Sequence, residues 1–200
     1  MKALPQRLRA AFQSASVRRS RDFGRHGINR AQLQAAVSAG LVERTGRGLY
    51  VLPNASTITE QHTLAEVAAR IPNGIFCLLT ALRFHQLTTQ NPSEIWVALP
   101  PRAWRPRLDV GPVRLLHFSG VALQAGMEEH EVEGIAVRVY SPAKTVADCF
   151  KFRNKVGLDV ALEALRETWK ARRATMEDLH HFAKVCRVAR IMQPYLESLQ

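Results

Sequence analysis

Four polar side chains that can read base pairs lie within nine residues of one another near the start of the chain. They are Arg30, Gln32, Gln34 and Ser38. Arginine pairs bidentately with the edge of guanine and glutamine with that of adenine, so these residue types can discriminate base pairs in the major groove of DNA. Leu33, Ala36 and Val37 recur among them with the period of a helix and are expected to face a core, which turns the four polar side chains outward.

Further cations stand on both sides of this segment. Arg18, Arg19, Arg21 and Arg25 precede it, and Arg44 and Arg47 follow it. Arginines of this kind contact phosphates and fix the register of a protein on DNA without reading its bases. Arg47 lies between two glycines in the run RTGRGLYVLP, which predicts a tight hairpin whose tip approaches phosphate or the minor groove.

The positive charge of the chain is concentrated in its first quarter. The formal net charge is +11 over 200 residues, and residues 1–53 hold ten Lys or Arg against two acids, hence +8. The other 147 residues carry only +3. Such a basic segment with a folding pattern indicates a polyanionic partner, and double-stranded DNA is the leading candidate.

The elements that must position these side chains follow from local signals. Helices are expected at about residues 5–15, 21–26 and 30–39, and strands at 41–44 and 48–52. Asn29 with Gln32 three residues later predicts a capping box at the start of the third helix, and Gly40 is expected to end it. Asn29 is also a candidate DNA contact. This order is typical of a winged helix-turn-helix, whose third helix enters the major groove. The alternative is a winged helix that contacts proteins and leaves its arginines in solvent.

The rest of the chain predicts a mixed α/β domain that ends in helices. Residues 54–59 have the composition of a linker, which gives a DNA-binding domain at 1–53 and a second domain at 60–200. A helix is expected at 60–70, and strands are expected at 94–99, 113–118, 130–132 and 135–140. Helices follow at about 142–152, 157–171, 176–185 and 189–199, the last kinked or broken at Pro194. The predicted fold class is therefore α+β.

Two stretches of the sequence resemble a known family. The run HGINRAQLQAAVSAGLVERTGRGLYVLP is similar to the winged-helix domain of AbiEi-type antitoxins of type IV toxin–antitoxin systems. The stretch from LRFHQLTTQNPSEIWVALP to VRVYSPAKTVADCFKFRNKVGLDVALEALRE resembles the antitoxin domain of the same group, so that the resemblance covers about residues 20–195. It implies a repressor of its own operon, acting in phage defence. It also implies a second domain that counteracts a nucleotidyltransferase-like toxin encoded beside it.

The segment YSPAKTVADCFKFRNK supplies the candidates for antitoxin function, namely Lys144, Asp148 and Arg153. Lys144 and Asp148 are one helical turn apart and can form an ion pair. The simpler interpretation is an amphipathic helix with Val146, Cys149 and Phe150 buried and a charged face in solvent, to which Lys144 is the expected exception. The loop 100–107 contains Trp104 among three arginines, which suits base stacking but is expected to be a rigid, packed loop.

The sequence holds none of the catalytic patterns that accompany DNA-binding domains. No lysine follows an acid by two residues, as a PD-(D/E)-x-K nuclease requires, and the paired aspartates of nucleotidyl transfer are also missing. Three cysteines without a C-x-x-C pair are expected to be buried thiols in a cytoplasmic protein. We expect no enzyme activity, no cofactor, no metal and no membrane contact. The alternatives are a DNA-targeted nuclease or transferase and a ligand-sensing transcriptional regulator.

Overall fold

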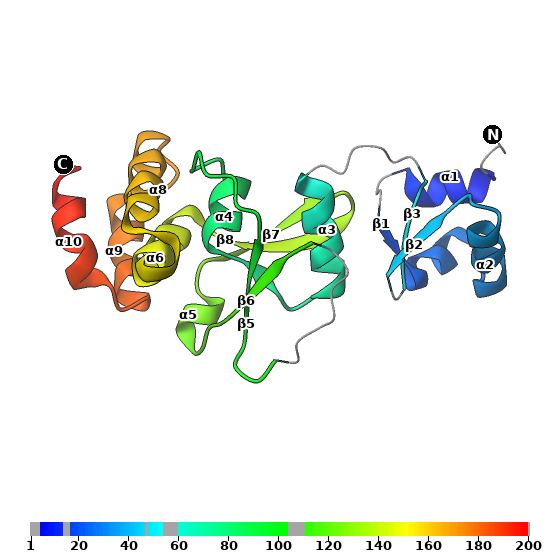
Figure 1. Cartoon of the computed structure of the whole chain (residues 1–200), viewed down its shortest axis with the longest axis horizontal. Coiled ribbons are helices and arrows are strands. Elements are labelled where there is room, and N and C mark those ends of the chain that lie inside the picture. The colour runs from blue at the N-terminus through cyan, green and yellow to red at the C-terminus, as the bar shows by residue number, and fades with distance from the viewer. Residues whose placement is uncertain (1–4, 14–16, 47, 54–59, 104–110, 200) are drawn as a thin grey trace. The chain divides into compact units, whose positions relative to one another are not determined.

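The computed structural model describes residues 5–13, 17–46, 48–53, 60–103 and 111–199 and shows an α+β fold, as predicted (Figure 1). Arg47, the predicted linker 54–59 and Trp104 of the arginine-rich loop lie outside the described residues. The described residues divide into two compact units. The first holds those up to Pro72 together with His130–Val137, and the second holds the others from Asn73 onward.

The N-terminal part of the first unit is a set of helices packed on a small antiparallel sheet. Its elements are α1 (Gln6–Phe12), β1 (Val17–Arg19), the 3-10 helix η1 (Ser20–His26), α2 (Arg30–Ser38), β2 (Glu43–Gly46) and β3 (Leu49–Val51). The strand order is β1-β3-β2. Phe23 lies at the centre of the core, with its ring edge-on to those of Phe12 and Tyr50 at centroid distances of 5.6 Å each. Sequence reasoning missed β1, because only Val17 of its three residues is buried.

Local capping explains why α2 begins and ends where it does. The Gln32 backbone N–H donates to Asn29 Oδ1 over 2.9 Å, and the Asn29 backbone N–H donates to Gln32 Oε1 over 3.0 Å. At the other end Gly40 has a φ of 68° and donates to the Val37 carbonyl, while Leu41 donates to Ala36. This is a Schellman motif, for which glycine is the preferred left-handed residue. The predicted capping box and the predicted end at Gly40 are both confirmed.

Helix α3 (Glu60–Arg70) groups with the N-terminal elements by its contacts. Arg70 forms an ion pair with Glu66 one turn earlier at 2.8 Å, and it also donates to the carbonyl of Thr45 on β2. His62 Nδ1 lies 2.9 Å from Glu133 Oε2, at the turn between two later strands. These polar contacts connect α3 to segments on both sides of it in the sequence.

A five-stranded mixed sheet organises the next part of the chain. Its elements, with the short helices between them, are β4 (Ile75–Phe76), α4 (Leu78–Phe84), β5 (Ile95–Leu99), β6 (Val113–His117), α5 (Val121–Gln124), β7 (Met127–Val132) and β8 (Ile135–Tyr140). The strand order is β6-β5-β4-β8-β7, with β5 parallel to β6 and β4 parallel to β8. Glu133 and Gly134 both have positive φ, as a two-residue hairpin turn requires.

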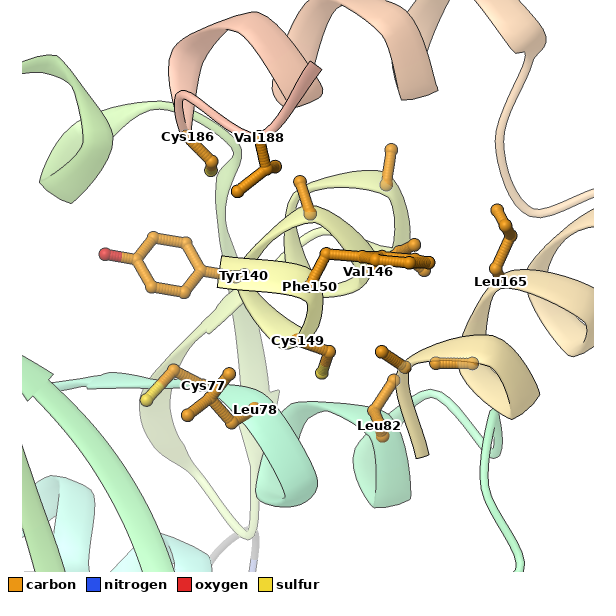
Figure 2. Packing of buried hydrophobic residues seen from close by; sticks show 14 of the residues in the cluster. Cys77, Leu78, Leu82, Tyr140, Val146, Cys149, Phe150, Leu165, Cys186 and Val188 are labelled. Atoms are coloured by element: carbon orange, nitrogen blue, oxygen red, sulfur yellow. The ribbon is translucent and has the colours of Figure 1, made fainter. Parts of the chain in front are cut away.

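The C-terminal helices enclose α6, which is the central element of the second core. The central helix is α6 (Pro142–Lys151). The helices that follow it are α7 (Arg153–Val156), α8 (Leu158–Lys170), α9 (Met176–Val185) and α10 (Ala189–Glu197). Every residue of α6 from Pro142 to Phe150 is buried, and Figure 2 shows Val146, Cys149 and Phe150 surrounded by apolar side chains of other elements. The predicted solvent-exposed charged face of this helix is therefore wrong. Helix α10 runs through Pro194 without a break. None of the described helices has the length and apolar character needed to cross a bilayer.

Candidate nucleic-acid interface

The solvent-facing side of α2 presents base-reading side chains in one row. Arg30, Gln34 and Ser38 are exposed and follow one another at intervals of four residues, which places them on the same flank of the helix. Ala31 and Ala35 are exposed beside them. Small side chains let a helix approach base edges closely, and alanine can contact the methyl group of thymine. This row can therefore supply both polar and apolar contacts to a groove.

Gln32 and Asn29 occupy a different position from the one expected of base-reading residues. Both are exposed, but each uses its side-chain oxygen in the capping box of α2. Gln32 also lies roughly 160° around the helix from Gln34, at about 100° per residue. Bidentate recognition of adenine needs the amide oxygen as well as the amide nitrogen. Gln32 and Asn29 thus contribute to the capping of the helix, and Arg30, Gln34 and Ser38 are exposed on it as candidates for base contacts.

The arginines expected to contact phosphate divide into two groups. Arg18 and Arg19 belong to β1 and are half-buried, and Arg18 Nε donates to the Ala11 carbonyl over 2.5 Å. Burial lowers the pKa of Arg19, and the neighbouring Arg21 adds to this shift. Arg21 and Arg25 on η1 are exposed, Arg21 being 3.9 Å from Asp22. The second group is the more exposed of the two and is the better placed to meet a phosphate.

Sequence reasoning missed two cations on the exposed side of α1. Arg7 and Arg9 are both exposed, and Arg7 donates to the carbonyl of Gly27 at the end of η1 over 3.3 Å. The signal that could have found them is the spacing of Leu8, Ala11 and Phe12, which face the core and so place both arginines in solvent. Arg7 and Arg9 therefore extend the positive surface of the unit onto a third helix.

The hairpin of β2 and β3 is tied to η1 at its turn. Gly48 has a φ of 76°, and its carbonyl accepts hydrogen bonds from the Ser20 backbone N–H over 2.8 Å and from the Ser20 hydroxyl over 3.2 Å. A Cβ on Gly48 would meet Ser20 Oγ at 3.0 Å. The positive φ thus favours glycine at 48, and a larger residue would also displace the Ser20 side chain. Arg44 on β2 is exposed, and the placement of Arg47 is not described.

Two of the three antitoxin candidates, Lys144 and Asp148, lie in the interior of the second unit. Lys144 and Asp148 are both 0% exposed, with Lys144 Nζ 2.5 Å from Asp148 Oδ2. The ammonium also lies 4.0 Å from the ring centroid of Tyr140 and 5.0 Å from that of Phe118. Burial raises the pKa of Asp148, and Lys144 opposes this shift by charge and by hydrogen bonding. The predicted pair is present, but neither residue can touch a partner in this structure.

The neighbours of this pair are also buried. Cys186 Sγ donates to Asp148 Oδ1 over 3.2 Å, and burial raises the pKa of the Cys186 thiol to about 12. All three cysteines are free and buried, as predicted. Arg153 is half-buried and donates to the Phe150 carbonyl over 3.1 Å, so that it caps the end of α6. Among the described residues, no three His, Cys, Asp or Glu are arranged to hold a metal ion.

An exposed row of base-reading side chains on a capped helix, flanked by arginines, is a surface of the kind that DNA-binding regulators present. A comparison with known protein families gives a match over this same part of the chain. The family described as "Transcriptional regulator, AbiEi antitoxin" matches residues 6–53 of this chain. The resemblance predicted from the sequence is confirmed over these residues. No curated protein matches the chain.

Proposed function

We propose that this protein is a DNA-binding antitoxin that represses its own toxin–antitoxin operon. Residues 1–53 act as a winged helix-turn-helix, with α2 in the major groove and the β2–β3 hairpin as the wing. The domain at 60–200 counteracts a nucleotidyltransferase-like toxin, and the protein is a cytoplasmic regulator and not an enzyme. The family match over residues 6–53, with its description as a transcriptional regulator and antitoxin, supports this assignment.

One observation carries the DNA-binding half of this function. Arg30, Gln34 and Ser38 are exposed in a row on a helix whose ends are fixed by their own capping residues, so that the row is presented in one orientation. Exposed Arg21 and Arg25 on the preceding helix supply charge at the flank. Phosphate contacts of this kind give affinity and salt dependence, and base contacts give specificity.

Binding of the full-length chain to DNA from immediately upstream of its own coding sequence tests this assignment. We expect Arg30→Ala to weaken binding to that DNA by about 1–3 kcal/mol and to leave binding to unrelated DNA nearly unchanged. The double variant Arg21→Ala with Arg25→Ala should weaken binding to the upstream DNA and to unrelated DNA by a similar degree. It should also reduce the slope of log K against log salt by about one for each phosphate that is no longer neutralised. Fluorescence anisotropy over a range of salt concentrations measures both effects.

Gln32→Ala and Arg166→Ala serve as matched controls. Gln32→Ala removes a side chain of α2 that belongs to the capping box. It should therefore lower the stability of the protein and leave its discrimination between DNA sequences nearly unchanged. Arg166→Ala removes an exposed arginine from α8 and should leave DNA affinity within twofold. An equal decrease in affinity for all DNA sequences on Arg30→Ala would show that α2 does not read bases.

Toxin counteraction is inferred from the resemblance of the second domain to the antitoxin domain of the group and from the description of the matched family as an antitoxin. The test is co-expression with a nucleotidyltransferase encoded in the neighbouring reading frame. We expect growth to stop with that enzyme alone and to resume when this chain is present. Rescue should persist with Arg30→Ala, because the DNA-reading row is separate from the second domain. Failure to rescue growth at full expression of a folded chain would contradict the antitoxin role.

A further inference from the structure

A small pocket lies in the second unit where three separate segments of the chain meet. It has a volume of about 260 Å³. Its lining comes from Ser119–Ala122 after β6, from Lys151 at the end of α6, and from Val185 and Arg187 at the end of α9. Pockets for whole drug-sized ligands usually exceed about 300 Å³. The size therefore suits one compact polar group and the atoms next to it.

The charge at this pocket is positive and is not balanced locally. Lys151 and Arg187 are exposed, none of the lining residues is acidic, and within the described part of the chain neither cation forms an ion pair. Lys151 Nζ lies 5.9 Å from the ring centroid of Phe118 and 5.8 Å from that of Phe152. The nearby carboxylate of Asp148 is already paired with Lys144 at 2.5 Å. Two positive charges are thus left facing the pocket.

Arg187 stands at a backbone position that normally favours glycine. Its φ is 61°, its N–H donates to the Lys184 carbonyl, and the N–H of Val188 donates to Ala183. This is the Schellman motif that Gly40 completes at the end of α2. An arginine in the left-handed region carries backbone strain that glycine would not. The strained residue supplies one of the two charges of the pocket.

We propose that this pocket binds a phosphate group, held by Lys151 and Arg187 with the hydroxyl of Ser119 as a further donor. Guanidinium and ammonium groups are the side chains that recognise phosphate, and a hydroxyl can donate to a third oxygen. The phosphate belongs either to a free nucleotide or to the backbone of a nucleic acid. Phosphate binding here uses no residue of the first unit, so it does not depend on DNA reading by α2.

Because Arg187 is strained, replacing it with glycine can test the contribution of its charge to phosphate binding without destabilising the fold. Glycine suits a φ of 61°, so Arg187→Gly should keep or raise the melting temperature while it removes one charge from the pocket. Arg172→Gly is a matched control, because Arg172 has a φ of 52° and completes the same motif at the end of α8, outside this pocket. Lys151→Gln removes the second charge independently.

The experiment measures dissociation constants of the full chain for orthophosphate, for ATP and for a short DNA duplex, at constant ionic strength. We expect Arg187→Gly and Lys151→Gln each to weaken ATP or duplex binding at least tenfold, Arg187→Lys to weaken it less, and Arg172→Gly to change it less than twofold. Weakening confined to ATP identifies a free nucleotide as the source of the phosphate, and weakening confined to the duplex identifies the nucleic-acid backbone.

Three results would overturn phosphate binding at this pocket. One is the absence of binding by any of the probes at millimolar concentration. Another is an unchanged affinity of Arg187→Gly for both ATP and the duplex. The third is a decrease in affinity in Arg172→Gly as large as that in Arg187→Gly, which would show that the net charge of the chain, and not the pocket, determines the affinity. The variant Arg30→Ala serves as a further control in each measurement. Because Arg30 lies in the first unit, this variant should bind ATP with the same affinity as the unaltered chain.

Discussion

Lys144 and Asp148 form an ion pair that is completely removed from water, with a nitrogen–oxygen distance of 2.5 Å. Two charges in an apolar interior are costly to desolvate, and their mutual attraction offsets this cost only when both partners are present. Here the rings of Tyr140 and Phe118 face the ammonium, and the Cys186 thiol donates to the carboxylate. The pair therefore fixes α6 against β8 and α9 and acts as a positioning element for the residues at its ends.

We predict that Lys144→Met lowers the free energy of unfolding by about 3–5 kcal/mol, because it leaves the Asp148 carboxylate buried without a counter-charge. The double variant Lys144→Met with Asp148→Leu should recover most of this stability, since it removes both charges. Urea denaturation followed by circular dichroism measures the two values. A double variant as unstable as the single one would show that packing around the aliphatic stem of Lys144, and not its charge, is what matters.

At the scale of elements, a single carboxylate connects α8 to the residues after α4. Glu163 accepts hydrogen bonds from the Thr89 backbone N–H over 2.8 Å, from the Thr89 hydroxyl over 2.7 Å and from the Thr88 hydroxyl over 3.0 Å. Burial raises the pKa of Glu163, but the three hydrogen bonds lower it by more, so that the net pKa is below its usual value. The ionised form is therefore the one that stabilises this connection.

We predict that Glu163→Gln lowers stability by about 1 kcal/mol at pH 7, a value kept small because the carboxylate is partly solvated. A folded-state pKa below the unfolded value means that the stabilisation is complete above the unfolded pKa of about 4.5. It disappears as pH falls through the folded-state pKa. The difference between the two chains should thus shrink below pH 4.5, as measured by thermal melting from about pH 3 to 7. A difference that is independent of pH would contradict this assignment.

At the scale of the whole molecule, the contacts of α3 bear on where the proposed DNA-binding domain ends. The sequence favours a boundary at 54–59, and α3 follows that boundary in the chain. Arg70 of α3 nevertheless donates to the Thr45 carbonyl of β2 and is oriented by Glu66. Helix α3 also belongs to the same compact unit as the N-terminal helices. A fragment that stops at Pro53 therefore lacks a support that one ending at Pro72 retains.

We predict that the fragment 1–72 melts at a higher temperature than the fragment 1–53, and that both bind the upstream DNA with similar affinity because both contain α2. Arg70→Ala in the longer fragment should remove part of the difference in melting temperature. Reversal of charge with Arg47→Glu should weaken DNA binding of either fragment to all sequences alike. A folded 1–53 fragment with no affinity for DNA at low salt would place the DNA-binding function elsewhere.

The sequence by itself determined those features that depend on residues close together in the chain. Asn29 with Gln32, and Gly40, satisfy backbone groups within a few residues, so the two ends of α2 could be located without a structure. The concentration of charge in residues 1–53 is likewise a property of composition. The positions of Arg30, Gln34 and Ser38 in solvent could be predicted in the same way, because the spacing of the apolar residues of a helix determines which residues lie on its polar face.

Only the tertiary structure decided what depends on residues far apart in the chain. The helix of Lys144 and Asp148 has a charged side that is typical of a solvent-exposed surface, yet this side is buried against Phe118, Tyr140 and Cys186. Two-residue β4 becomes a central strand only by pairing with β5 and β8. The pocket lined by Lys151 joins segments as far apart in the chain as Ser119 and Arg187. Burial and strand pairing of this kind result from packing between elements, so they cannot be predicted from the spacing of residues within one element.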